Sequence, residues 1–234
     1  MKKILVLIIL SVIPLTPLFA QKIDNEFRVF NYTNFNNSGH NYKISCIWCP
    51  EKIDNYSIMC IQAHEEYAAT KNYLMLPKQS MAESWTENLT AMKELFIKND
   101  SIAQENAIAS DIKKNISDKF DFTGIFGEGI TRYSIYGPIK KNYSGSGYEY
   151  CVIVLYKYTA GQSSMELYIG DYYLNHTQLL WTFNNVQDFD AIINAINWSN
   201  FDEAFNKQVS EYKQQQEAVK AAAEKQKKES ALFD

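Results

Sequence analysis

An unbroken apolar run in the second half of the chain constrains the fold more than any other feature. Residues 148–158 read YEYCVIVLYKY, and six consecutive residues, CVIVLY, lack any charged side chain. Side chains alternate between the two faces of a strand, so this run must be covered on both faces. Strand-like segments at 130–136, 164–169 and 177–183 surround it, with turn residues between them. We therefore expect 148–158 to be a central strand of an antiparallel sheet.

The first half of the chain contains a second group of strand-like segments. Residues 27–35 favour an opening strand, and residues 42–49 and 56–63 favour the two arms of a hairpin. Residues 64–77 are ambiguous, because HEEYAATKNYLML suits a helical turn followed by a strand. Glycines between residues 124 and 129 favour a loop.

Segments with the periodicity of helices lie between and after these strands. Ser80 and Glu83 have the spacing of a capping box. Apolar residues then recur at helical intervals in two stripes, first Met81, Trp85, Leu89, Met92 and Phe96, then Ile108, Ile112, Ile116 and Phe120. A closing amphipathic helix is expected at 188–198, with Asp188 as its N-cap. These stripes are typical of helices that face a core.

The C-terminal segment 201–230 has no Pro or Gly and is rich in Ala, Glu, Gln and Lys, so it is expected to be helical. Its apolar stripe is strong at Phe205, Val209 and Tyr212, and then weakens to Gln216, Val219 and Ala223. This pattern predicts a helix that docks at its start, runs into solvent and frays over 226–234. The alternative is a coiled-coil-like helix that binds a partner.

The N-terminus has the layout of a secretory signal peptide. Lys2 and Lys3 precede an apolar run from Ile4 to Ile13, and prolines and the small Ala20 follow. We expect cleavage between Ala20 and Gln21, and a secreted or periplasmic protein without a later membrane span; an uncleaved anchor is the alternative. This start and the Asn-, Tyr-, Lys- and Ile-rich composition resemble exported proteins of Bacteroidetes.

Length and charge complete the expected organisation. The chain has 234 residues, 46% of them hydrophobic, and a formal net charge of −4. A chain of this size can bury a sizeable core, and its acidic balance argues against nucleic-acid binding. The expected division is a signal peptide at 1–20, one α+β domain at 21–200 and the C-terminal helix at 201–234.

The order of elements resembles the PsbP-like α/β/α domains. Strands, a long helix, an antiparallel run of strands and the closing segment LLWTFNNVQDFDAIINAIN follow one another over residues 27–198. The resemblance implies a central antiparallel sheet flanked by helices. It also implies that proteins are the usual partners, although fold alone does not fix function.

Cysteines are the first candidates for chemistry. The chain has four, and an exported protein can hold disulfides. A hairpin turn centred near Ile53 places Cys46 opposite Cys60, so this pair is the expected bridge. Cys151 has no local partner and is expected to be buried.

Other cysteine chemistry is less favoured by the local sequence. Cys46 and Cys49 have CxxC spacing, but they end a predicted strand instead of beginning a helix, so the dipole that activates a redox thiol is missing. Cys46, Cys49, Cys60 and His64 approach the spacing of zinc ligands. Because the surrounding residues are apolar and β-rich, we expect no metal and no cofactor.

Motifs for nucleophilic catalysis are missing from the sequence. Five carboxylates could serve as acid–base residues but are more simply explained as parts of solvated faces: Asp100, Asp111, Asp118, Asp121 and Glu128. With three histidines, neither H-E-x-x-H nor a G-x-S-x-G elbow occurs. Tyrosine is abundant in the β-rich half, and solvent-facing tyrosines suit protein or glycan partners. The expected partner-binding surface consists of Tyr133, Tyr136, Tyr148, Tyr172 and Tyr173. Alternatively, these tyrosines fill half-buried sheet positions.

The sequence thus favours an exported, non-enzymatic protein that binds a protein, an envelope component or a glycan. The alternative is a hydrolase whose active site is assembled from residues that are distant in sequence.

Overall fold

The computed structural model describes residues 21–22, 28–48, 57–62, 72–128, 136–140, 150–171 and 176–232. Its elements along the chain are β1 (Gln21–Lys22), β2 (Arg28–Asn37), β3 (His40–Trp48), β4 (Ser57–Gln62), β5 (Asn72–Leu76), α1 (Gln79–Glu105), β6 (Ile112–Asn115), the 3₁₀ helix η1 (Ser117–Lys119), β7 (Ile125–Glu128), β8 (Tyr136–Lys140), β9 (Tyr150–Thr159), β10 (Gln162–Asp171), β11 (His176–Phe183), α2 (Val186–Ala195) and α3 (Trp198–Ser230).

The strands form two antiparallel sheets that meet at β8. One sheet has the order β1-β2-β3-β4-β5-β7, and the other runs through β9, β10 and β11. Strand β8 pairs antiparallel with β7 and parallel with β9, while β6 also pairs with β9. The predicted central strand is confirmed, because β9 has neighbours on both sides and both Val154 and Leu155 are buried.

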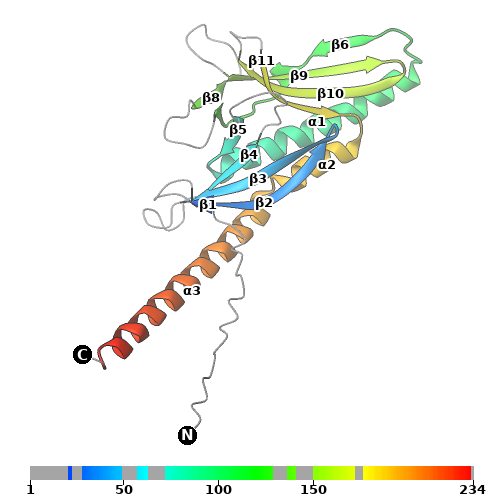
Figure 1. The fold of residues 1–234 in the computed structure, drawn as a ribbon. Helices are drawn as coiled ribbons and strands as arrows, with labels where there is room; N and C mark the ends of the chain where they lie inside the picture. The colour runs from blue at the N-terminus through cyan, green and yellow to red at the C-terminus, as the bar shows by residue number, and fades with distance from the viewer. Residues whose placement is uncertain are drawn as a thin grey trace.

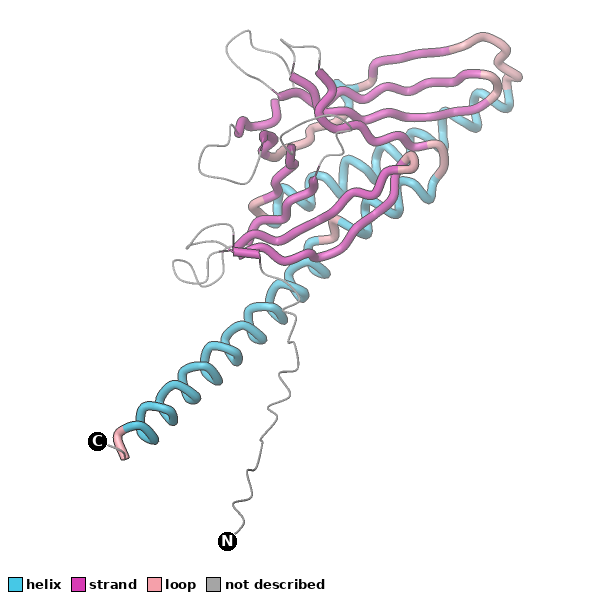
Figure 2. The backbone as a smooth tube through the Cα atoms, viewed as in Figure 1, coloured by secondary structure: helices cyan, strands magenta, loops and turns pink. Residues whose placement is uncertain are grey.

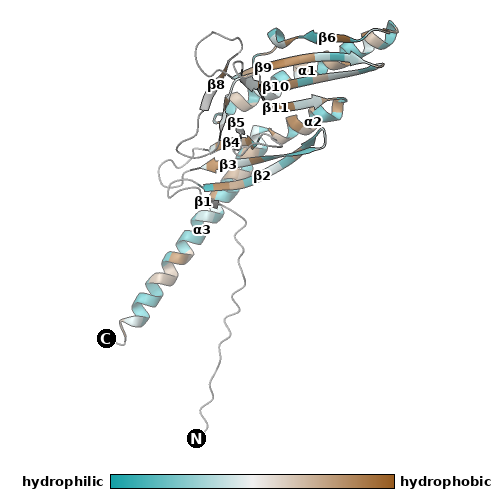
Figure 3. Ribbon diagram, turned by 45° about the horizontal axis from the view of Figure 1, so that its top comes forward, coloured by the Kyte–Doolittle hydropathy of each residue, from teal (hydrophilic) through white to brown (hydrophobic). Residues whose placement is uncertain are grey.

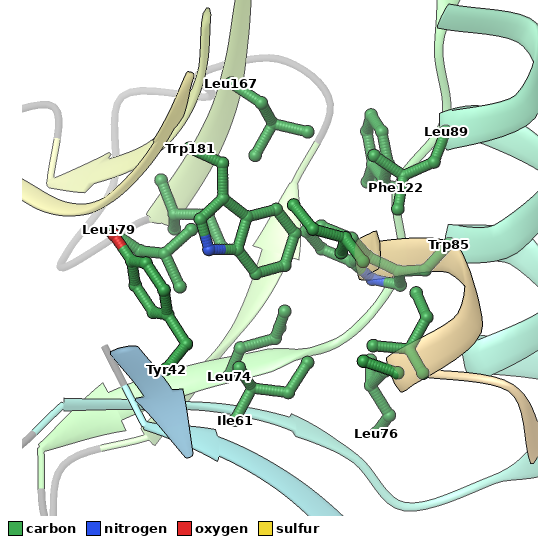
Figure 4. Close-up of a cluster of buried hydrophobic side chains, with 14 of the residues drawn as sticks. Tyr42, Ile61, Leu74, Leu76, Trp85, Leu89, Phe122, Leu167, Leu179 and Trp181 are labelled. Carbon is green, nitrogen blue, oxygen red and sulfur yellow. The ribbon is translucent and has the colours of Figure 1, made fainter. Parts of the chain in front are cut away.

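The helices pack against the sheets to give the expected α+β fold (Figure 1). Side chains from both sheets and from α1, α2 and α3 share one main core. At its centre the Trp85 ring of α1 lies 5.6 Å from the Trp181 ring of β11 and 4.4 Å from the Phe122 ring (Figure 4). The Trp85 indole N–H donates to the carbonyl of Thr123 at 2.7 Å, which fixes the ring in the core.

The outer edge of β11 is closed by side chains from the β2–β3 hairpin. The Asn37 amide donates to the Thr182 carbonyl at 2.7 Å and accepts from the Thr182 N–H at 2.8 Å. The Tyr42 hydroxyl donates to the Leu180 carbonyl at 2.7 Å. Asn37 is only 2% exposed, so it replaces the backbone pairing that a neighbouring strand would provide. The two sheets are thereby linked at their far edges.

The long helix α1 departs from the predicted boundaries. It begins at Gln79 after Lys78, without a side-chain cap, and it continues through residues 99–101, where an interruption was expected. The helical prediction for the second stripe, Ile108 to Phe120, is wrong, because this segment forms β6 and η1. Pairing of β6 with β9 decides its structure, since tertiary contacts override local periodicity.

Two other predicted boundaries are corrected. Residues 125–128 form β7 instead of a loop, because β5 and β8 pair with this segment on either side. Helix α2 starts at Val186 after the N-cap Asn185, so Asp188 is not the cap. Asp188 instead occupies the third helical position and completes a capping box with Asn185.

Helix α3 docks through its first turns and then projects from the body (Figure 2). Phe201, Phe205 and Val209 are buried, and the Trp48 ring contacts the Phe205 and Tyr212 rings edge-on at 5.9 and 5.3 Å. The Arg28 guanidinium lies 4.3 Å from the centre of the Tyr212 ring. Every described residue from 213 onward is exposed, and this part of the helix is mostly hydrophilic (Figure 3). The predicted docked start and solvated continuation are confirmed.

Candidate functional site

Cys46 and Cys60 are both free thiols, so the structure does not contain the expected Cys46–Cys60 disulfide. The hairpin register differs from the prediction by one residue, because Cys46 pairs with Met59 and Cys60 pairs with Ser45. A shift of one residue sends a side chain to the opposite face of a sheet. Cys46 accordingly belongs to the main core, whereas Cys60 packs with Ile47 in a smaller cluster on the other face.

This geometry also bears on the alternative cysteine sites. Thiols on opposite faces of a sheet cannot bind one tetrahedral zinc ion, while Cys49 and His64 lie outside the described residues. Burial raises the pKa of the Cys46 and Cys60 thiols well above the ordinary range, which is the reverse of an activated nucleophile. In the described part of the chain, no cluster of His, Cys, Asp and Glu could hold a metal ion.

The predicted tyrosine surface falls mainly outside the described residues. This applies to Tyr133, Tyr148, Tyr172 and Tyr173, and the structure describes only the backbone of Tyr136, in β8. Other tyrosines of the β-rich half occupy buried or half-buried positions. Tyr156 and Tyr158 are each 5% exposed in the core, and Tyr168 is half-buried on the outer face of β10.

A cleft of about 730 Å³ lies where three segments meet. One wall is the second half of α1, including Asp100 and Gln104, and another is the turn between β9 and β10. The third wall is the junction between β11 and α2, residues 184–187. This volume falls within the roughly 300–1,000 Å³ that is typical of sites for small ligands.

The turn between β9 and β10 is a tight two-residue hairpin loop. Its central residues, Ala160 and Gly161, have φ angles of 52° and 81°. Two-residue hairpins of this kind need positive φ at both central positions, which glycine adopts without strain. The Gln104 amide donates to the Gly161 carbonyl at 3.4 Å and so connects α1 to the tip of this hairpin. Two walls of the cleft are therefore tied together.

The lining of the cleft is polar and almost uncharged. It contains five carboxamides, three hydroxyls and a single carboxylate, that of Asp100. The Ser163 hydroxyl is buried against the Tyr156 hydroxyl at 2.9 Å. The Phe96 side chain also lines the cleft, but it is only 6% exposed and packs against Phe189 in the core. A ligand would therefore meet both polar and apolar atoms, and the polar groups would supply its directional contacts.

The start of α2 at the edge of the cleft is already capped. The Asp188 carboxylate accepts from the backbone N–H groups of Asn184 and Asn185 at 2.7 and 3.2 Å. The Asn185 amide oxygen accepts in turn from the Asp188 N–H at 3.1 Å. Because a carboxylate of the chain itself occupies this position, the helix start does not act as a site for an external anion.

A smaller hollow of about 220 Å³ lies at the bulge of β2, between Asn31 and Thr33. Lys43 of β3 also lines it. Its size is below that of typical ligand sites, so the larger cleft is the better candidate.

Sequence reasoning missed the cleft, because its lining comes from turn and helix-surface residues. The Gln-Ser-Ser run at 162–164 and the Asn-Asn pair at 184–185 are, by themselves, ordinary turn residues. Only the packing of α1 brings Asp100 beside them.

The described helices include none that is long and apolar enough to cross a membrane. Comparison with known proteins finds no matching family model, no similar curated protein and no similar solved structure.

Proposed function

We propose that the chain is an exported, non-enzymatic binding protein of the cell envelope or exterior, with a protein or a glycan as its partner. The observation that carries this proposal is the polar cleft between α1, the β9–β10 turn and the β11–α2 junction. Its carboxamides and hydroxyls can donate and accept hydrogen bonds, which is what recognition of a polar partner requires. The resemblance in element order to the PsbP-like domains supports the same class of function.

The chemistry of the cleft favours binding over hydrolysis. Asp100 is the single carboxylate among the described residues that line it, and no histidine or cysteine joins it there. Hydrolysis of a glycosidic bond normally uses two carboxyl groups, one as acid and one as base or nucleophile. A hydrolase with a site assembled from distant residues is the competing proposal, and it predicts turnover in the experiment below.

Export is part of the same proposal, and the N-terminal pattern from Lys2 to Ala20 supports it. The protein isolated from its own host should begin at Gln21 when its intact mass is measured. A chain that still begins at Met1 and stays with the membrane fraction would contradict export.

Binding is tested with the immobilised protein. The polysaccharide fraction and the protein fraction of the host envelope are passed over it separately, and bound material is eluted and compared before and after incubation. We expect retention from one fraction, without new reducing ends or new peptide termini. Retention from neither fraction would refute binding, and accumulation of cleavage products would favour the hydrolase.

A further inference from the structure

We infer that the cleft takes a short neutral oligosaccharide; this inference rests on the proposed binding function and specifies its ligand. Charge is the first argument. The described residues that line the cleft include no Lys, Arg or His, and the one ionisable side chain among them is that of Asp100. A phosphate, sulfate or carboxylate on the ligand would find no cation and would be repelled by Asp100. The ligand is therefore not anionic at the positions that enter the cleft.

Hydrogen-bonding capacity is the second argument. Sugar hydroxyls both donate and accept, so they match carboxamides, which present a donor and an acceptor on one planar group. Gln162, Asn184 and Gln187 are exposed at the cleft, and their side-chain amides make no bond within the described structure. A carboxylate such as Asp100 accepts from two hydroxyls through stronger, charge-assisted bonds. These four groups come from all three walls of the cleft.

The surroundings of the cleft argue against a peptide ligand. A peptide that adds a strand needs a free sheet edge, but Asn37 and Tyr42 already bond the backbone of β11 at Thr182 and Leu180. Peptides that bind in pockets are usually anchored by apolar side chains. Among the described residues that line the cleft, the apolar side chains are those of Val186 and the nearly buried Phe96.

The inference is tested with a panel of immobilised short oligosaccharides of neutral hexoses and N-acetylhexosamines, together with sulfated and carboxylated counterparts. The best neutral chain is then titrated calorimetrically against wild-type protein and variants. Asp100→Ala should weaken its affinity about tenfold, and Gln187→Ala about fivefold, because they remove a charged and a neutral hydrogen-bond partner.

Two exposed residues away from the cleft supply matched controls. Asp111→Ala removes an exposed carboxylate after α1, and Gln215→Ala removes an exposed amide from α3. Both should bind the chosen oligosaccharide within about twofold of wild type, since neither lines the cleft. Thermal melting of all four variants checks that each is folded.

The inference is overturned if no neutral chain binds, or if the cleft variants bind it as tightly as the controls do. Preference for acidic chains overturns it as well. If neutral chains fail but an envelope protein is retained, and Asp100→Ala releases it, the binding function stands and only the ligand class is wrong. If the cleft variants retain every envelope component as wild type does, the proposed use of the cleft fails too.

Discussion

Helix α3 should divide into a part that stabilises the fold and a part that does not. Phe205 is 2% exposed and contacts the Trp48 ring, whereas Val219 is 64% exposed. Replacing a buried Phe with Ala costs about 3–5 kcal/mol. For a domain of this size, 3 kcal/mol corresponds to a fall in Tm of roughly 6–12 °C.

Truncation after Gln216 should have a much smaller effect. The described residues that are lost are exposed, and Val219 retains most of its accessible surface in the fold. At ~25 cal/mol per Å² of buried apolar surface, the expected loss is below about 0.5 kcal/mol. Val219→Ala serves as the control for truncating an apolar side chain on the same helix, and its expected cost is equally small.

The free energy of unfolding is measured by urea denaturation. Tryptophan fluorescence is a suitable signal, because Trp48 lies 5.9 Å from the Phe205 ring. The division of α3 into a stabilising and a non-stabilising part is refuted if truncation after Gln216 costs as much as Phe205→Ala. It is also refuted if Phe205→Ala leaves the free energy of unfolding within about 0.5 kcal/mol of wild type.

Three further changes test the edge closure, the thiols and the pH dependence. Asn37→Ala should lower the free energy of unfolding, measured by urea denaturation, by about 2–4 kcal/mol, because it leaves the Thr182 N–H and carbonyl without their partner. A loss below about 0.5 kcal/mol would contradict the closure of the sheet edge. Cys46 and Cys60 should resist a thiol reagent in the folded protein and react in unfolded, unreduced protein; continued protection on unfolding would indicate a disulfide. Burial raises the pKa of Tyr42 to about 12, so its phenol ionises at lower pH in the unfolded chain than in the fold. Stability should therefore fall as pH rises from about 10 to 12, and Tyr42→Phe should flatten that fall.

The sequence predicted the elements whose patterns are local and strong. The apolar run around Val154 predicted a strand covered on both faces, and the apolar stripe at Phe205 predicted a helix docked on the core. Both are present in the structure. The helical spacing around Ile112 predicted a helix, but these residues form a strand. Apolar spacing alone cannot show that β9 is available to pair with them.

The register of the β3–β4 hairpin and the position of the cleft could not be predicted from the sequence, because both depend on how distant segments pack together. A displacement of one residue in the β3–β4 pairing was enough to separate Cys46 from Cys60. The cleft needs Asp100 of α1 beside residues that follow β9 and β11, so its polar lining has no contiguous signature. Its residue types are common in turns, and no motif marks them as a site.

The use of the cleft is tested most directly by NMR titration of isotope-labelled protein with the best neutral oligosaccharide from the panel. Gln104, Gly161, Ser164 and Gln187 line the cleft from its three walls, and the signals of their backbone amides are followed. We expect the largest chemical-shift changes to cluster at these residues, and we expect Asp100→Ala to need about tenfold more oligosaccharide to reach the same changes. Changes that cluster instead at the hollow around Thr33, or no changes at all at saturating oligosaccharide, would contradict the proposed use of the cleft.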